Sequence, residues 1–179
     1  QATNSMPEIC GRICPQDRLC EGNCVIEQAG FGTVTIGAVE RYINDKAWEE
    51  GWVRPLVAGA DRGQSVGVVG AGPAGLAAAE LLREMGYGVT VYDRHDRAGG
   101  LLTYGIPGFK LEKPVVERRV QRLADGGIAF RLGFEVGRDA TLAELRKAHD
   151  AVFVATGVYK ARDLEVPGAG SAGVVPALE

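Results

Sequence analysis

The sequence has no excess of basic residues and no long apolar run, and it contains only two histidines. It has 20 Lys and Arg against 23 Asp and Glu, and the formal charge of −3 predicts no basic face for nucleic acid. No run approaches the roughly 18 apolar residues that a membrane helix needs. The first five residues show neither the basic start nor the apolar stretch of a signal peptide. We therefore expect a cytoplasmic protein that binds neither nucleic acid nor a membrane.

Cysteine is absent outside one short segment, which holds Cys10, Cys14, Cys20 and Cys24. The reducing compartment expected for this chain disfavours disulfides. The Cys-x2-Cys knuckle common in zinc sites is missing, whereas close thiolates with a Cys-Pro step are typical of iron–sulfur ligation. The spacing therefore favours an iron–sulfur centre, with a zinc site or free thiols as the alternatives.

Beyond the cysteines, the sequence predicts an α/β chain. Apolar residues at three- and four-residue spacing predict a helix over 36–50, and residues 51–64 have the composition of a linker. We place a boundary there, between a mainly α-helical iron–sulfur domain over 1–60 and a partial Rossmann-like, FAD-binding domain over 65–179. In the second domain we expect strands over 66–69, 89–92, 128–132 and 151–155, the last of them buried, helices over 73–85, 113–125 and 141–149, and a long glycine-rich loop over 94–110.

A glycine signature, Gly70-x-Gly72-x-x-Gly75, lies between the first of these strands and its helix. In this context the first glycine permits a tight turn, the second lets backbone approach a pyrophosphate and the third lets the helix pack on the strand. The helix N-terminus then offers unpaired N–H groups to phosphates. Asp93 closes the next strand. A carboxylate at this place can accept hydrogen bonds from ribose hydroxyls and would repel a 2′-phosphate. The pattern predicts FAD or NAD rather than NADP, and its simpler alternative is a tight turn that binds nothing.

Two later features favour FAD over NAD. Gly99-Gly100 follows the acid and provides flexible backbone beside the cofactor, and the strand over 151–155 ends in Ala155-Thr156-Gly157. Small residues there let a flat ligand lie close to backbone. No acid–base or nucleophilic set of residues stands out, so we predict no catalytic side chain. His149 closes a predicted helix, where a cation suits the dipole, and His95 is expected at the surface.

Several longer motifs carry a resemblance to a known family. They are Ile9-Cys-Gly-Arg-Ile-Cys-Pro-Gln-Asp-Arg-Leu-Cys-Glu-Gly-Asn-Cys24, the later Gly-Gly-Leu-Leu-Thr-Tyr-Gly-Ile-Pro-Gly-Phe-Lys110, and Val-Ala-Thr-Gly-Val-Tyr-Lys-Ala-Arg162. Across essentially the whole chain the sequence resembles the small (β) subunit of bacterial NADPH-dependent glutamate synthase. It is also similar to the flavin-containing part of dihydropyrimidine dehydrogenase and to the large subunit of electron-bifurcating ferredoxin:NADP oxidoreductases.

The resemblance implies two [4Fe–4S] clusters and one FAD. Cys14 and Cys20 would serve one cluster, while Cys24 and the non-cysteine ligand Glu40 would serve the other, and Cys10 matches a cysteine that is not a ligand. Together with Gly70 and Gly75 of the glycine signature, the residues implied for FAD are Gly72, Pro73, Ala74, Asp93, Arg94, Gly100, Leu101, Lys110, Val136, Ala155, Thr156 and Gly157. Lys110 is expected near the flavin, where it would steady negative charge on the reduced ring.

The family also implies a function and a partner. NADPH would reduce FAD, and electrons would pass through the clusters to the large (α) subunit for glutamate biosynthesis. An earlier cysteine segment and an NADPH domain with a second glycine signature belong to the family pattern and are not in this sequence, so we expect a portion of a longer polypeptide that would not turn over NADPH alone. The alternatives are the same architecture in a bifurcating or pyrimidine-reducing complex, and a non-catalytic, zinc-binding interaction module.

Overall fold

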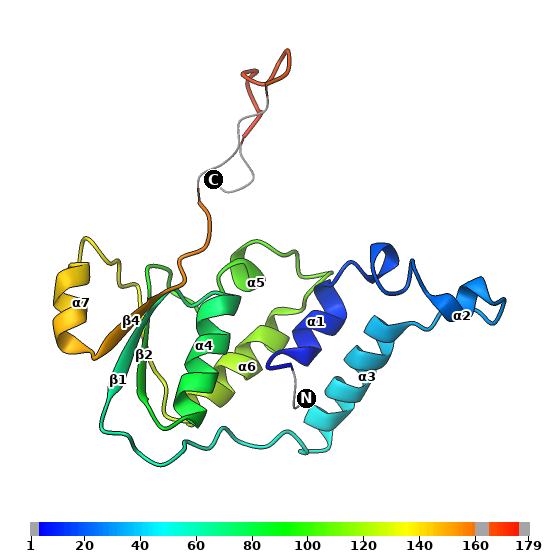
Figure 1. Cartoon of the computed structure of the whole chain (residues 1–179). Coiled ribbons are helices and arrows are strands. Elements are labelled where there is room, and N and C mark those ends of the chain that lie inside the picture. Colours follow the sequence, from blue (N-terminus) through cyan, green and yellow to red (C-terminus); the bar gives the residue numbers. More distant parts are fainter. Residues whose placement is uncertain (1–3, 160–164, 176–179) are drawn as a thin grey trace.

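The computed structural model describes residues 4–159 and 165–175, so Lys160, Ala161 and Arg162 of the last motif lie outside the described residues. Its centre is a sheet of four parallel strands in the order β3-β2-β1-β4 (Figure 1). The strands are β1 (Ser65–Val69), β2 (Gly88–Asp93), β3 (Ala129–Leu132) and β4 (Ala151–Val154). The α/β class and the parallel sheet are confirmed.

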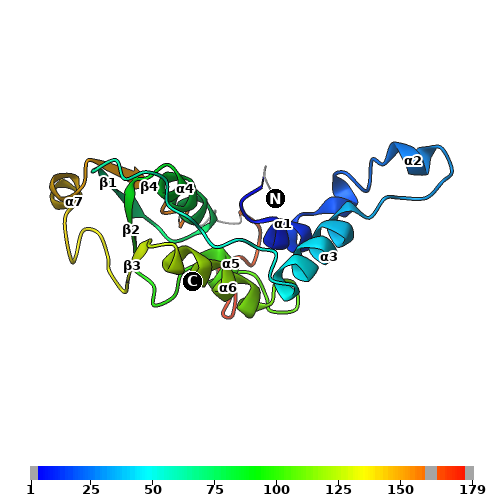
Figure 2. The ribbon, with the colours of Figure 1, turned by 90° about the horizontal axis from the view of Figure 1, so that it is seen from below.

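The helices of this part follow from local signals. Pro73 and Pro114 stand in the first turns of α4 (Pro73–Glu84) and α6 (Lys113–Asp125), where a missing N–H costs nothing. A capping box opens α7 (Leu142–Ala148), because Thr141 and Glu144 exchange side-chain and backbone hydrogen bonds. In both views α4 and α6 cover one face of the sheet and α7 lies on the other side (Figures 1 and 2).

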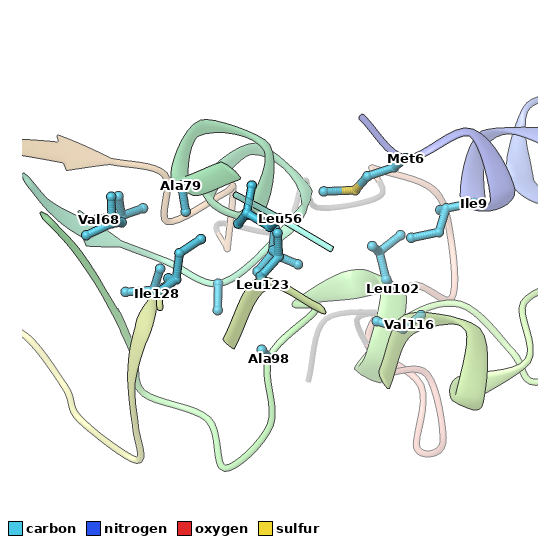
Figure 3. Packing of buried hydrophobic residues seen from close by; sticks show 14 of the residues in the cluster. Met6, Ile9, Leu56, Val68, Ala79, Ala98, Leu102, Val116, Leu123 and Ile128 are labelled. Carbon is cyan, nitrogen blue, oxygen red and sulfur yellow. The ribbon is translucent and has the colours of Figure 1, made fainter. Parts of the chain in front are cut away.

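The main core lies between the sheet and the helices α4 and α6. Val68 and Val91 from the two central strands are fully buried, as are Leu76 of α4 and Leu123 of α6 (Figure 3). Their burial holds the start of α4 against the end of β1, and so it positions the glycine signature.

The N-terminal segment is helical and joins the same core. It contains α1 (Pro7–Ile13), a short 3-10 helix (Gln16–Arg18), α2 (Val25–Gln28) and α3 (Ile36–Glu49). Met6 and Ile9 are buried in one cluster with Leu102 and Val116 of the α/β part (Figure 3). Residues 51–64 form no helix or strand, yet Leu56 from that linker is also buried in the cluster. The division at this linker into two domains stays a prediction.

Two sequence-based expectations need correction. The loop predicted over 94–110 contains a short helix, α5 (Leu101–Tyr104). The strand predicted as buried over 151–155 is an edge strand, with only β1 beside it in the described residues, and Phe153 is 43% exposed. The helix predicted over 36–50 is confirmed as α3, although its apolar positions Ile36, Val39 and Ile43 are exposed.

The exposed stripe on α3 has a packing cause. Helix α1 contacts α3 through glycine rather than through the apolar stripe. A Cβ on Gly11 would lie 2.8 Å from the backbone nitrogen of Arg41 and 3.1 Å from the carbonyl oxygen of Gly37. This close approach selects the small side of α3 and leaves the larger apolar side chains uncovered in the described part of the chain.

Candidate functional site

The glycine signature forms a tight turn at the carboxyl end of β1. Gly70 has φ +112°, in the region that favours glycine, and a Cβ there would lie 2.3 Å from the carbonyl oxygen of Ala155 on the neighbouring chain segment. Gly75 lies in the first turn of α4, and a Cβ on it would lie 1.8 Å from the carbonyl oxygen of Gly70. Two of the three glycines are therefore required by the fold itself.

Gly72 differs from its two neighbours in the signature. It is the residue before α4, with extended backbone, and nothing lies within 4 Å of the place its Cβ would occupy. No side chain caps the helix at this position. The N–H groups at the first turn of α4 therefore have no side-chain cap as acceptor, and uncapped N–H groups at a helix N-terminus are suited to binding phosphate.

Asp93 ties the turn to the end of β2. Its Oδ2 accepts a hydrogen bond from the backbone N–H of Ala71 at 2.7 Å, and its Oδ1 accepts one from the N–H of His95 at 2.9 Å. The side chain is largely buried. Each carboxylate oxygen keeps a further lone pair. Asp93 can therefore hold the turn and still accept a hydrogen bond from a ligand hydroxyl.

A cavity of about 160 Å³ opens beside this turn, at the carboxyl ends of β1 and β2. Open parallel sheets bind ligands in this position. Five of its lining residues were predicted as cofactor contacts from the sequence: Gly70, Asp93, Arg94, Val136 and Thr156. Sequence reasoning missed the other five, which are Val69, Tyr92, Phe134, Glu135 and Tyr159.

The missed residues give the cavity its aromatic wall. The Tyr92 and Phe134 rings lie 5.0 Å apart, and the Arg94 guanidinium lies 4.1 Å from the centre of the Tyr159 ring. Aromatic rings and a guanidinium group at the edge of a cavity favour a flat, electron-rich ligand. Tyr92 directly precedes the predicted acid, so its place could have been read from the strand. Phe134 and Tyr159 come from other segments. No local signal marks Phe134, whereas Tyr159 lies in the last of the family motifs quoted above and could have been found there.

The remaining predicted cofactor residues do not line this cavity. Gly100 packs on Gly72, because a Cβ on Gly100 would lie 2.9 Å from the Cα of Gly72. Gly100 is also the residue before α5, and the N–H of Gly99 donates to the carbonyl of Ala71 at 2.8 Å. The other members of this set are Pro73, Ala74, Leu101, Lys110, Ala155 and Gly157. Lys110 is exposed.

The four cysteines are spread over the N-terminal helices. Cys10 is on α1, Cys14 is the residue after it, Cys20 follows the 3-10 helix, and Cys24 precedes α2. Backbone N–H groups of Val34 and Glu27 lower the pKa of the Cys24 thiol, which favours the thiolate that a metal needs.

The donor chemistry therefore suits a soft metal, but the geometry does not yet form a site. Within the described ranges, no three Cys, His, Asp or Glu side chains are gathered closely enough to hold a metal ion. Glu40 accepts a hydrogen bond from Asn4 at 3.2 Å, and the same Asn4 contacts the Cys10 sulfur at 3.8 Å. This arrangement places Glu40 near Cys10, the cysteine not expected to be a ligand.

The two histidines have structural surroundings. His149 follows α7, as predicted, and its ring lies between the Tyr92 hydroxyl at 2.9 Å and the Ser65 hydroxyl at 3.1 Å. His95 stacks on Tyr104 with ring centres 4.8 Å apart.

No helix in the described ranges is long and apolar enough to cross a membrane.

Two family models match the chain. Residues 1–52 match dihydropyrimidine dehydrogenase domain II with its 4Fe-4S cluster, and residues 68–124 match an NAD(P)-binding Rossmann-like domain. Among solved structures, the chain is similar to FprA of Mycobacterium tuberculosis in complex with NADPH, with a TM-score of 0.52 and 24% identity over 60% of this chain and 25% of that one. That likeness shows the fold alone. A 2-naphthoyl-CoA reductase complex gives a TM-score of 0.51 and 25% identity, covering 66% of this chain and 17% of that one.

Relatives of known name are closer in sequence. The glutamate synthase [NADPH] small chain of Azospirillum brasilense is 69% identical over 100% of this chain and 37% of its own length. The small chain of Escherichia coli is 55% identical over 88% of this chain and 33% of that protein. The putative oxidoreductase AegA of Escherichia coli is 50% identical over 98% of this chain and 27% of that protein. The chain thus spans about a third of the length of these two small chains, and over that span its sequence is similar to theirs.

Proposed function

We propose that this chain is the electron-transfer flavoprotein portion of an NADPH-dependent glutamate synthase small subunit. Electrons would pass from NADPH to FAD in the full polypeptide, and then through [4Fe–4S] clusters to a large (α) subunit that makes glutamate. The observation that carries the proposal is the cavity at the end of β1 and β2, bordered by the glycine turn and Asp93. The family match supplies the reaction.

The residues around the cavity would bind and orient FAD. The first turn of α4 would hold the diphosphate on its free N–H groups, and the open position at Gly72 leaves room for it. Asp93 would accept a ribose hydroxyl, while Arg94 and Tyr159 would flank a planar ring. When bound, FAD supplies the conversion between two-electron and one-electron transfer. We assign no catalytic acid or base to the protein.

The assignment of cluster ligands remains a proposal. Cys14 and Cys20 would contribute to one cluster, and Cys24 with Glu40 to the other, each completed by thiolates from another segment. The lowered pKa of Cys24 and the 4Fe-4S family match over residues 1–52 support it. Because these side chains are not gathered within the described ranges, binding would require the exposed segment around Cys20 to move.

The test is the cofactor content of the full polypeptide, purified without oxygen. We expect one FAD per chain, iron and inorganic sulfide in equal amounts, and no zinc. Flavin without iron would refute the cluster assignment, and zinc in place of iron would support an interaction module. A protein with neither flavin nor iron would refute the proposal as a whole.

Two further tests address the partner and the compartment. Affinity capture of the full polypeptide from its own cells should recover a glutamate synthase large subunit from the cytoplasmic fraction. Capture of a pyrimidine-reducing or ferredoxin-linked partner in its place would assign the same architecture to a different enzyme.

A further inference from the structure

The imidazole of His149 joins two neighbouring strands of the sheet through its two nitrogens. Its Nε2 lies 2.9 Å from the hydroxyl of Tyr92 on β2, and its Nδ1 lies 3.1 Å from the hydroxyl of Ser65 at the start of β1. A neutral imidazole donates from one nitrogen and accepts at the other, and each hydroxyl can do both, so both hydrogen bonds form in either tautomer. The His149 ring therefore links Ser65 to Tyr92.

The backbone around His149 is fixed independently of its ring. The N–H of His149 donates to the carbonyl of Leu145 on α7 at 3.0 Å, and Leu145 is buried. The next residue, Asp150, donates from its N–H to the carbonyl of Ser65 at 3.0 Å, and its carboxylate accepts from the N–H of Ser65 at 2.8 Å. Because this segment is tied both to α7 and to β1, His149 can act as a fixed anchor for the side chain that it contacts.

Gly67 makes room for the imidazole in the middle of β1. A Cβ on Gly67 would lie 2.7 Å from Cδ2 of His149, which is closer than the roughly 3.5–4.0 Å at which carbon atoms pack. Gly67 is buried between Thr90 of β2 and Val152 of β4. Glycine inside a strand weakens it, and it often marks a place where another group approaches closely. In β1 the group that approaches is the His149 ring.

Tyr92, which His149 contacts, is a wall of the cavity beside the glycine turn. It is paired with Val69 across the sheet, and both residues line the cavity. Its ring lies 5.0 Å from the Phe134 ring, while its hydroxyl is directed at His149. Tyr92 is only partly buried, so packing alone does not confine its ring to one rotamer. The hydrogen bond to His149 adds the constraint that packing does not supply.

We propose that His149 is a positioning residue for the cofactor cavity, because its hydrogen bond holds the Tyr92 ring in the orientation that forms the wall for a planar ring of FAD. His149 does not line the cavity itself and acts through Tyr92. A wall side chain that is already held loses little rotational freedom when the ligand binds. Releasing one such side chain should weaken binding roughly three- to tenfold. This inference rests on the proposed function.

The experiment measures the affinity of the full polypeptide, freed of flavin, for added FAD, at one pH for every variant. Tyr92→Phe removes only the hydroxyl, and His149→Leu keeps a side chain of similar bulk but removes both of its hydrogen bonds. His149→Gln retains an amide that can still bond the Tyr92 hydroxyl. Gly67→Ala leaves His149 in the sequence but places a methyl group where its ring lies.

Gly88→Ala is the matched control for Gly67→Ala. Gly88 is paired with Ser65 in the sheet, so it faces the same side as Gly67, two residues after Ser65. A Cβ on Gly88 would meet its nearest atoms at 3.6 Å, which is ordinary contact. This variant therefore adds the same methyl group to the same face of the sheet without displacing His149.

Tyr92→Phe, His149→Leu and Gly67→Ala should each weaken FAD binding roughly three- to tenfold. His149→Gln and Gly88→Ala should bind FAD as the wild type does. The double variant of Tyr92→Phe with His149→Leu should bind no more weakly than either single variant, because both changes remove the same hydrogen bond. Thermal unfolding of the flavin-free proteins provides the second readout, since a purely structural role would lower the melting temperature and leave the affinity of the folded protein unchanged.

Several outcomes would overturn the inference and leave the proposed function intact. They are wild-type affinity in Tyr92→Phe or His149→Leu, additive losses in the double variant, and a loss in His149→Gln as large as that in His149→Leu. An equal loss in Gly88→Ala and Gly67→Ala would show that the strand matters and not the imidazole. If His149→Leu does not fold, Tyr92→Phe and Gly67→Ala decide. If the wild-type polypeptide binds no FAD, the proposed function fails and this inference fails with it.

Discussion

Replacing two glycines of the same turn, one at a time, should separate the needs of the fold from those of a bound diphosphate. Gly75→Ala places a Cβ 1.8 Å from the carbonyl oxygen of Gly70, whereas Gly72→Ala places one where nothing lies within 4 Å. Both changes add a single methyl group to the start of α4. The two positions differ in the space around the added Cβ, and in that Gly72 caps the helix while Gly75 lies inside it.

The structure sets the size of each effect. Overpacking at Gly75 should cost about 3 kcal/mol, the upper end of the usual range, because the added Cβ meets a backbone carbonyl oxygen. The better helix propensity of alanine returns roughly 0.5–1 kcal/mol. A net loss of about 2 kcal/mol corresponds to a fall of roughly 4–8 °C in the melting temperature of a folding unit of 150–250 residues. At Gly72, alanine is a poorer helix cap, which destabilises the fold, but it also makes the unfolded chain less flexible, which stabilises the fold. Because the two effects nearly cancel, we expect the free energy of unfolding to change by less than about 1 kcal/mol.

The assay measures unfolding and flavin binding on the same preparations of the full polypeptide. Thermal unfolding of flavin-free protein should show the loss for Gly75→Ala alone. Flavin affinity of Gly72→Ala should fall by at least about tenfold, equivalent to about 1.4 kcal/mol, because the methyl group occupies the place proposed for the diphosphate. If Gly72→Ala retains flavin like the wild type, the diphosphate does not lie at this turn. If Gly75→Ala unfolds at the wild-type temperature, the close packing seen here is wrong.

Three further predictions follow from single contacts. Asp93→Asn should weaken the hydrogen bond to Ala71 and reduce flavin retention, with a stability loss of about 1–3 kcal/mol measured in urea, and unchanged retention would contradict the ribose contact. Burial by itself raises the pKa of Asp45, but hydrogen bonds from Arg12 and Arg118 outweigh it and hold that pKa below its ordinary value of 3.8. The stability that Asp45 contributes should therefore be present above about pH 4 and lost as pH falls through the lowered pKa. Asp45→Asn should flatten that part of the pH–stability curve, and a curve of wild-type shape would count against the ion pairs of Asp45 with Arg12 and Arg118. Thr141→Ala should remove the capping box with Glu144 and lower stability by about 1 kcal/mol, with faster hydrogen exchange confined to α7.

The family match also bears on how these results should be interpreted. The chain covers 37% of the length of the Azospirillum brasilense small chain. The described residues expose the edge strand β4 and the apolar side of α3. Exposed strand edges and apolar patches of this kind promote aggregation unless other parts of a protein bury them. Measurements on the full polypeptide are therefore preferable for every variant above.

Local signals determined most of the α/β part from the sequence alone. Proline in the first turn, the capping box at Thr141 and the glycine signature each act through neighbouring residues, and the helix over 113–125 was predicted with the bounds that the structure has. Asp93 was found because its spacing from Gly70 follows from one strand–helix–strand unit. Five of the ten residues around the cavity were found in the same way or through the family motifs.

Tertiary structure decided what those elements meet. Phe134 reaches the cavity from a segment with no signal of its own. Strand β4 is exposed because of its place at the edge of the sheet, which apolar composition does not encode. The pairing of Glu8 with Arg119 joins residues 111 positions apart. The sequence shows only a glutamate on one amphipathic helix and an arginine on another, because contacts between distant helices depend on how they pack and not on any local pattern.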